Sequence, residues 1–196
     1  AVRRVLRVKF RLGLFDQTAA DFDALPRSVD EAEVRRSARD VARESFVLLK
    51  NDTAALPLTS ALRSIALIGA RADSAQHDHS WWGPAGHAKP ATETLRQALE
   101  KRMRPGQTLN FVPAFKDPCG REFADKEAAV AVAQRADVIV YNVIEDCEIQ
   151  GEGVSRTNLR LSGRQQEMLD ALAATGKPIV LVVETGRPIV LAEADK

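Results

Sequence analysis

Apolar residues recur with two different periods along the chain, and each period predicts one type of element. Residues 1–15 and 28–42 carry apolar side chains at helical spacing, so we expect a helix in each stretch. Ser28 is the expected cap of the second helix, because Glu31 follows three residues later. Pro26 cannot continue a helix, which predicts an extended linker before this cap. Two structural units are therefore expected to meet at the linker.

From residue 64 onwards, short uninterrupted apolar runs alternate with helical patterns. The strand-like runs are SIALIG, TLNFV, DVIVYNVI and PIVLVVET, and helices are expected over 92–103, 124–136 and 162–175, the last capped by Ser162. This alternation predicts a parallel sheet covered on both faces, because each crossover helix must pack back onto the sheet. We therefore expect an open, mainly parallel sheet sandwiched between helices, a three-layer α/β/α fold.

Composition and charge narrow the range of functions. With 196 residues and 45% hydrophobic content, the chain is long enough to bury a sizeable core. Its 28 basic and 27 acidic residues give a formal net charge of +1, which provides no broad field to attract nucleic acid or an anionic membrane. No apolar run approaches the roughly 20 residues that a membrane-spanning helix needs. We therefore expect no nucleic-acid or membrane partner.

Two polar loops follow expected strands and are longer than a helix connection needs. They are ARADSAQHDHSWWGPAGHAKP, after SIALIG, and EDCEIQGEGVSRTNL, after DVIVYNVI. Functional loops of open parallel sheets lie beyond the carboxyl ends of the strands, so these two loops form the candidate site. Trp81 and Trp82 in the first loop suit stacking against the apolar face of a sugar, but packing across a domain interface explains them equally well.

Several other kinds of site lack their motifs. The turn GARADS has no paired glycines for a dinucleotide, and no P-loop motif occurs, so no nucleotide cofactor is expected. His77 and His79 have no convincing third ligand, so no metal is expected either. Cys119 and Cys147 could pair, but two buried thiols are the favoured interpretation.

Glu152 is the most distinctive residue of the second loop, because it stands between Gly151 and Gly153. Flanking glycines permit close approach of a ligand or of another part of the chain, and Arg156 can hold a loop or a substrate oxygen. A solvated loop carboxylate is the plainer interpretation, and the residues alone favour it.

Four spans, taken in order, resemble the second domain of glycoside hydrolase family 3, the β-glucosidase and β-xylosidase group. They are ARESFVLLKNDTAALPL, SIALIGARADS, DVIVYNVIEDCEIQGEGVSRTNLRLSGRQQEMLDAL and GKPIVLVVETGRPIVL. The combination is specific: ESFVLLKN precedes the first strand, an acidic loop ends in SRT, and a strand after GKP leads to GRP. The opening VRRVLRVKFRLGLFD is similar to the family's exit from its first domain, a (β/α)₈-type barrel.

The resemblance implies a domain of a retaining, exo-acting β-glycosidase that hydrolyses terminal β-D-glucosyl or xylosyl residues and needs no cofactor. In such enzymes an aspartate of the barrel attacks the sugar, while the sandwich domain supplies the acid/base glutamate. The residue that matches this glutamate is Glu152, with Glu148 as second choice, since Glu145 and Glu148 occupy the same loop.

The resemblance also implies substrate contacts. Trp81, and after it Trp82, match the place where some members hold an aromatic wall for the leaving-group sugar. Arg156 is a candidate substrate-binding residue, although it is better interpreted as an anchor of the loop. The implied partners are a β-linked oligosaccharide or aryl glycoside and the upstream barrel of the same protein.

Under this resemblance, residues 1–27 are the exit helix and linker from the barrel, and residues 28–196 are the sandwich domain, truncated at its C-terminus. The chain alone is then expected to be inactive, and family habit favours a periplasmic or secreted protein. The alternatives are a non-catalytic carbohydrate-binding domain or a structural fragment. A binding domain would keep its sugar affinity in a Glu152→Gln variant, whereas a structural fragment would bind no sugar.

Overall fold

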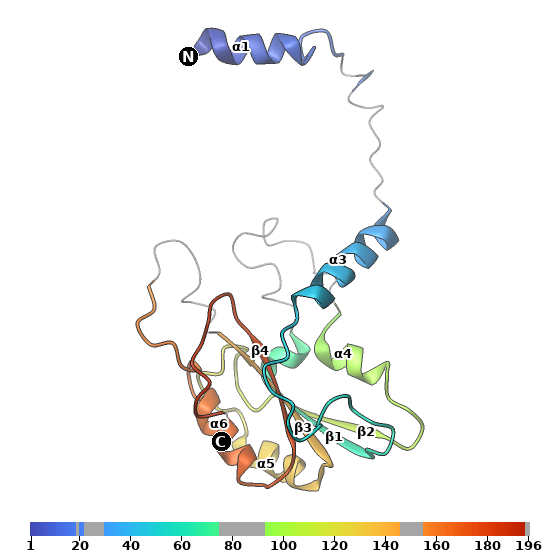
Figure 1. Ribbon diagram of the computed structural model, residues 1–196, viewed down its shortest axis with the longest axis vertical. Helices are drawn as coiled ribbons and strands as arrows, with labels where there is room; N and C mark the ends of the chain where they lie inside the picture. The colour runs from blue at the N-terminus through green and yellow to red at the C-terminus, as the bar shows by residue number, and fades with distance from the viewer. Residues whose placement is uncertain (19, 22–29, 75–92, 146–154, 195–196) are drawn as a thin grey trace. The chain divides into compact units, whose positions relative to one another are not determined.

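The computed structural model describes residues 1–18, 20–21, 30–74, 93–145 and 155–194. The chain divides into two compact units, Ala1–Lys50 and Asn51–Lys196. Figure 1 shows both units, and each is described by itself below. The predicted boundary between residues 27 and 28 lies outside the described residues and stays a prediction.

The first unit contains the two helices that the apolar spacing predicts. They are α1 (Val2–Arg11) and α3 (Glu31–Ser45), and neither contains a buried residue. The side chain of Asp30 caps α3, because its carboxylate accepts hydrogen bonds from the backbone N–H groups of Ala32 and Glu33. The prediction of Ser28 as the cap was therefore wrong, since the helix begins after Asp30.

The second unit is built on a four-stranded sheet in which every neighbouring pair is parallel. The strands follow the order β2-β1-β3-β4, so β1 and β3 are central and β2 and β4 are edges. All seven residues of β3 are buried, which explains its uninterrupted apolar sequence. The strands are β1 (Ser64–Ile68), β2 (Thr108–Val112), β3 (Val138–Ile144) and β4 (Ile179–Glu184).

Helices cover both faces of this sheet (Figure 1). Successive residues of β1 point to opposite faces: Ile65 and Leu67 pack with α4, whereas Ala66 and Ile68 pack with α5 and α6. The three-layer α/β/α fold predicted from the sequence is confirmed. The helices are the 3₁₀ turn η1 (Ala70–Asp73), α4 (Leu95–Glu100), α5 (Lys126–Arg135) and α6 (Gln165–Ala173).

The starts of α4 and α6 differ in their capping. Thr94 and Gln97 form a reciprocal capping box at the start of α4. The residue that precedes α6 is Arg164, whose side chain makes no capping hydrogen bond. The predicted cap at Ser162 was wrong, because the Ser162 hydroxyl instead lies 3.5 Å from the carbonyl oxygen of Ile144.

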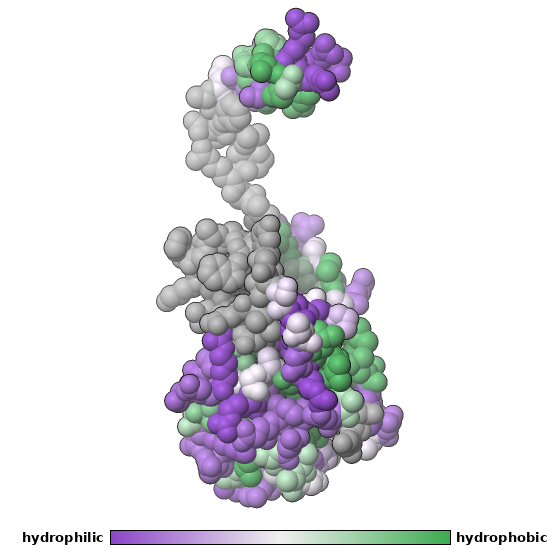
Figure 2. All heavy atoms as spheres, turned by 90° about the vertical axis from the view of Figure 1, so that its left-hand side faces the viewer, coloured by the Kyte–Doolittle hydropathy of each residue, from purple (hydrophilic) through white to green (hydrophobic). Residues whose placement is uncertain are grey.

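Polar side chains dominate the face of the second unit that Figure 2 presents, with hydrophobic residues in separate patches. The larger apolar residues are instead concentrated in the two core clusters beside the sheet. The two faces of the sheet are therefore occupied by apolar packing against the helices.

The strand order also determines where a site can form. The chain leaves β1 outwards to β2 and then crosses to β3, so the two connections diverge between β1 and β3. In open α/β sheets, ligands bind beyond the carboxyl ends of the strands at such a switch point. At the end of β1, Gly69 has φ of +117°, and a Cβ there would lie 2.3 Å from the carbonyl oxygen of Asn142. Only glycine lets β1 leave the sheet this close to β3.

Candidate active site

Glu145, the residue that follows β3, is a buried carboxylate held by side chains from two other segments. Arg156 Nη1 donates to Glu145 Oε1 over 2.9 Å, and Arg187 Nε donates to the same oxygen over 2.8 Å. Thr185 Oγ1 lies 3.2 Å from Oε2. The side chains of Glu145 and Arg156 are 0% and 6% exposed, so their attraction is only weakly screened by water.

Arg156 also binds the backbone of its own segment. Its Nε donates to the carbonyl oxygen of Asn158, and its Nη2 donates to that of Arg160. The planar guanidinium presents several donors in a fixed fork, which suits this combination of one carboxylate and two carbonyl groups. The described contacts of Arg156 are therefore with residues of this chain, at the two ends of the loop that Arg156 belongs to.

A second polar cluster lies on the neighbouring strand ends. Arg71 Nε donates to Glu184 Oε2 over 2.9 Å, and Asn142 Nδ2 donates to Glu184 Oε1 over 2.9 Å. Arg71 also donates to the carbonyl oxygen of Ser74. These contacts join the ends of β1, β3 and β4, so the carboxyl edge of the sheet is held by polar side chains.

Gln165, the first residue of α6, fixes the end of β3 through its buried amide. Its Oε1 accepts from the backbone N–H of Ile144 over 2.9 Å, and its Nε2 donates to the carbonyl oxygen of Ile144 over 2.7 Å. The hydroxyl of Tyr141 donates to the backbone carbonyl oxygen of Gln165 over 2.9 Å. Burial raises the pKa of Tyr141, so its phenol stays neutral and keeps this donor.

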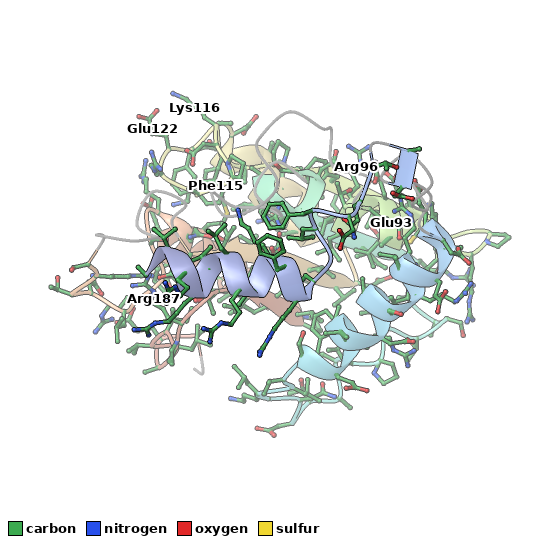
Figure 3. The ribbon with its side chains drawn as sticks, turned by 90° about the horizontal axis from the view of Figure 1, so that it is seen from above. Glu93, Arg96, Phe115, Lys116, Glu122 and Arg187 are labelled. Atoms are coloured by element: carbon green, nitrogen blue, oxygen red, sulfur yellow. The ribbon has the colours of Figure 1, made fainter. Side chains whose placement is uncertain are left out.

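A short antiparallel turn between β2 and α5 supports the same region. Its two sides meet at Phe115 and Phe123, whose rings stack with centroids 5.2 Å apart. Lys116 and Glu122 form an exposed ion pair beside them (Figure 3). At the tip, the carbonyl oxygen of Gly120 accepts a hydrogen bond from the backbone N–H of Arg164 over 2.8 Å. The turn therefore packs directly against the start of α6.

Cys119, in this turn, is buried and disulfide-bonded. The expectation of two buried thiols was therefore wrong for Cys119. Sequence reasoning favoured thiols because two isolated cysteines do not form a recognisable disulfide framework.

Most of the site residues predicted from the sequence lie outside the described residues. These are Glu152, Glu148, Trp81 and Trp82; His77, His79 and Cys147, which were not predicted to be site residues, also lie outside the described residues. Their predicted roles stay predictions. Among the described ranges, no group of three or more His, Cys, Asp or Glu side chains could hold a metal ion, and no helix is long and apolar enough to cross a membrane.

Sequence reasoning missed the partners of Glu145. Arg187, labelled in Figure 3, stands in the GRP motif that follows β4. This motif supported the family resemblance, but no contact was predicted for Arg187 from the sequence. An arginine between glycine and proline in a turn after a strand is the signal that could have pointed to a contact at the sheet edge.

The fold is an open α/β sandwich with a polar edge at the carboxyl ends of β1, β3 and β4. The sequence model of the glycosyl hydrolase family 3 C-terminal domain matches residues 46–196. The chain therefore belongs to glycosyl hydrolase family 3, and the resemblance inferred from the four sequence spans is confirmed.

Relatives with curated names agree with this assignment. The chain is 32% identical to a periplasmic beta-glucosidase of Salmonella typhimurium in an alignment of 220 residues, gaps included, that covers 100% of this chain and 28% of the relative. It is 30% identical to a beta-xylosidase of Formosa agariphila, over 96% of this chain and 27% of the relative. The chain thus spans little more than a quarter of the length of either relative.

Solved structures show the same fold. A beta-glucosidase from Listeria innocua in complex with isofagomine superposes with a TM-score of 0.77 at 28% identity, covering 98% of this chain and 26% of that chain. A beta-glucosidase involved in saponin metabolism from intestinal bacteria gives a TM-score of 0.75 at 30% identity, covering 95% and 29%.

Proposed function

We propose that this chain is the acid/base-contributing domain of a retaining, exo-acting β-glycosidase that hydrolyses terminal β-D-glucosyl or xylosyl residues. The observation that carries the proposal is the family match over residues 46–196, with relatives named beta-glucosidase and beta-xylosidase. The nucleophilic aspartate is assigned to an upstream barrel domain of the same protein, and β-linked oligosaccharides and aryl glycosides are the proposed substrates. Trp81 is proposed to stack against the leaving-group sugar, with Trp82 as the weaker candidate.

Glu152 is the proposed acid/base, with Glu148 as the second choice. In the first step its carboxyl group would donate a proton to the departing glycosidic oxygen, while the nucleophile forms the glycosyl-enzyme. In the second step the carboxylate would take a proton from the water that releases the sugar. Retention requires the two carboxyl groups to lie about 5–5.5 Å apart, so the segment that contains Glu152 must reach the nucleophile.

The test uses the chain joined to its native upstream barrel and compares wild type with Glu152→Gly on aryl β-glucosides and β-xylosides. If Glu152 is the acid/base, the variant loses about 10²–10⁴-fold on substrates with poor leaving groups. On substrates with good leaving groups, which form the glycosyl-enzyme without acid help, added azide restores turnover and yields a glycosyl azide, because azide attacks the anomeric carbon, displaces the nucleophilic carboxylate and needs no general base. Near-normal turnover of poor leaving groups by Glu152→Gly contradicts the assignment, and Glu148→Gly is the matched comparison.

The disulfide bond of Cys119 supports a location outside the reducing cytosol, because disulfides persist mainly in oxidising compartments. One similar beta-glucosidase is named as periplasmic. We therefore place the protein in the periplasm or outside the cell. Fractionation of the producing cells tests this, and recovery of the protein in the cytosol with reduced cysteines would contradict it.

A further inference from the structure

Glu145 and Arg156 stand at the two ends of the segment that contains the proposed acid/base. Glu145 follows β3 directly, and Arg156 precedes the stretch that leads into α6. Their ion pair of 2.9 Å joins these two ends, and both side chains are almost fully buried. A buried contact between the ends of a loop restricts the conformations that the loop can adopt.

The pair is also fixed to the rest of the sheet. The backbone N–H of Glu145 donates to the carbonyl oxygen of Glu184 over 2.9 Å, and Arg187 donates to the Glu145 carboxylate from the segment after β4. Two guanidinium groups therefore meet one carboxylate, and one of them comes from a neighbouring strand end. Arg156 is bound in turn to two carbonyl groups of residues 158 and 160. Glu145 and Arg156, at the two ends of the loop, are thus held together next to the end of β4.

We propose that Glu145 and Arg156 are positioning residues for the glycosidase reaction, with Arg187 as their support. They fix both ends of the segment that contains Glu152, so that its carboxyl group reaches the departing glycosidic oxygen in a single place. Neither residue touches the sugar under this proposal, and Arg156 is a loop anchor rather than a substrate ligand. The inference rests on the proposed function of Glu152.

Displacement of the acid has a kinetic signature that general destabilisation lacks. A misplacement of about 1 Å can cost roughly 10²-fold in rate. Only substrates whose leaving group needs protonation should lose this factor, because a dinitrophenolate departs without help from an acid. Misfolding instead reduces the concentration of active enzyme and lowers turnover of every substrate equally.

The experiment uses the full-length protein with its barrel and a series of aryl β-glycosides that differ in leaving-group pKa. Glu145→Gln keeps the shape of the side chain and removes its charge, and Arg156→Met removes the guanidinium. Arg160→Met is the matched control, because the Arg160 side chain is 57% exposed and pairs with Glu193 at the surface. The measured quantities are kcat/KM along the series and the melting temperature of each variant.

We expect Glu145→Gln and Arg156→Met each to lose about 30-fold or more on poor leaving groups and less than about 3-fold on dinitrophenyl glycosides. The double variant should lose little more activity than the worse single variant, since both substitutions break the same ion pair. The control should follow wild type throughout. Arg156→Lys, which keeps the charge but not the fork, should fall between wild type and Arg156→Met.

Two results overturn the inference. One is a loss that is equal for all leaving groups after correction for the folded fraction, and the other is no loss in properly folded Arg156→Met. If Glu145→Gln does not fold, the Arg156 variants alone decide. Failure of azide to rescue Glu152→Gly would instead reject the acid/base assignment, so the two failures are distinguishable.

Discussion

Asp137 Oδ2 accepts hydrogen bonds from two backbone N–H groups at the start of β1, from Arg63 over 2.6 Å and from Ser64 over 2.9 Å. The residue immediately before β3 therefore fixes the start of the neighbouring central strand. The hydrogen bond from the N–H of Arg63, followed by that from Ser64, lowers the pKa of Asp137. An ionised carboxylate at this position thus contributes to pairing of the two strands.

The lowered pKa determines how stability depends on pH. The unfolded chain binds this proton with a pKa of about 3.9, whereas the folded chain binds it less readily. The stability that the ionised carboxylate of Asp137 contributes is therefore fully present above the pKa of the unfolded chain. It is lost as the pH falls through the pKa of the folded chain. We expect Asp137→Asn to lower the melting temperature at pH 7, and the difference from wild type to shrink in strong acid.

Thermal unfolding monitored by circular dichroism across this pH range tests the prediction. Asp52→Asn, at an exposed position in the same unit, controls for the change in net charge. A difference between Asp137→Asn and wild type that stays constant down to strong acid would mean that the ionised carboxylate is not the stabilising species.

Gly69 yields the next prediction, because both its backbone angle and its surroundings exclude a side chain. We expect Gly69→Ala to destabilise the protein by about 3 kcal/mol or more, from a strained backbone plus the clash with the carbonyl oxygen of Asn142. Gly176 separates the two effects, since its φ is +69° and nothing lies within 4 Å of an added Cβ. Gly176→Ala should cost only about 1–2 kcal/mol.

Chemical denaturation measures the free energy of unfolding of both variants. The two values can be compared directly if the free energy falls with denaturant at the same slope in both. If Gly69→Ala costs no more than Gly176→Ala, β1 and β3 do not approach each other as closely at this point as the structure shows.

The central strands could be predicted from the sequence because their environment is simple. A strand buried on both faces needs an uninterrupted apolar run, and the run before Glu145 has one. Helix caps were less predictable: Ser28 and Asp30 are both good capping residues, and the choice between them depends on where the backbone leaves the helical conformation.

The candidate site shows a different limit. The loop that contains Glu145 and Arg156 could be located from its length and from the preceding strand. Their ion pair could not be predicted, because sequence spacing in a loop does not determine which side chains meet. The contact with Arg187 is harder still, since it joins segments from different strands. A tertiary contact of this kind has no local signature.

Gln165 should be far more important for stability than its sequence neighbour Gln166. Replacing Gln165 with leucine leaves the backbone N–H and carbonyl of Ile144 without their side-chain partner in the interior. Buried polar groups that lose their partners are costly, so we expect a loss of about 2–4 kcal/mol. Gln166, whose amide donates to Asp170 on the surface, is the control, and Gln166→Leu should change stability by less than about 0.5 kcal/mol.

Denaturant titrations of both variants measure this difference. Equal effects of the two substitutions would show that the amide of Gln165 does not hold the end of β3.

The disulfide bond of Cys119 leads to the last prediction, which concerns the connection between the turn at residues 115–123 and the candidate loop. The sequence contains two cysteines, so an intrachain bond can join Cys119 only to Cys147, which stands in the same loop as Glu152. We expect peptide mapping without reductant to recover the two cysteine-containing peptides as one linked species. Cys119→Ser should lower the free energy of unfolding by about 2–4 kcal/mol under oxidising conditions. Under reducing conditions wild type and variant should converge, because the cross-link is then absent from both. Two free thiols in the folded, air-oxidised protein, or a linkage between two copies of the chain, would contradict this pairing.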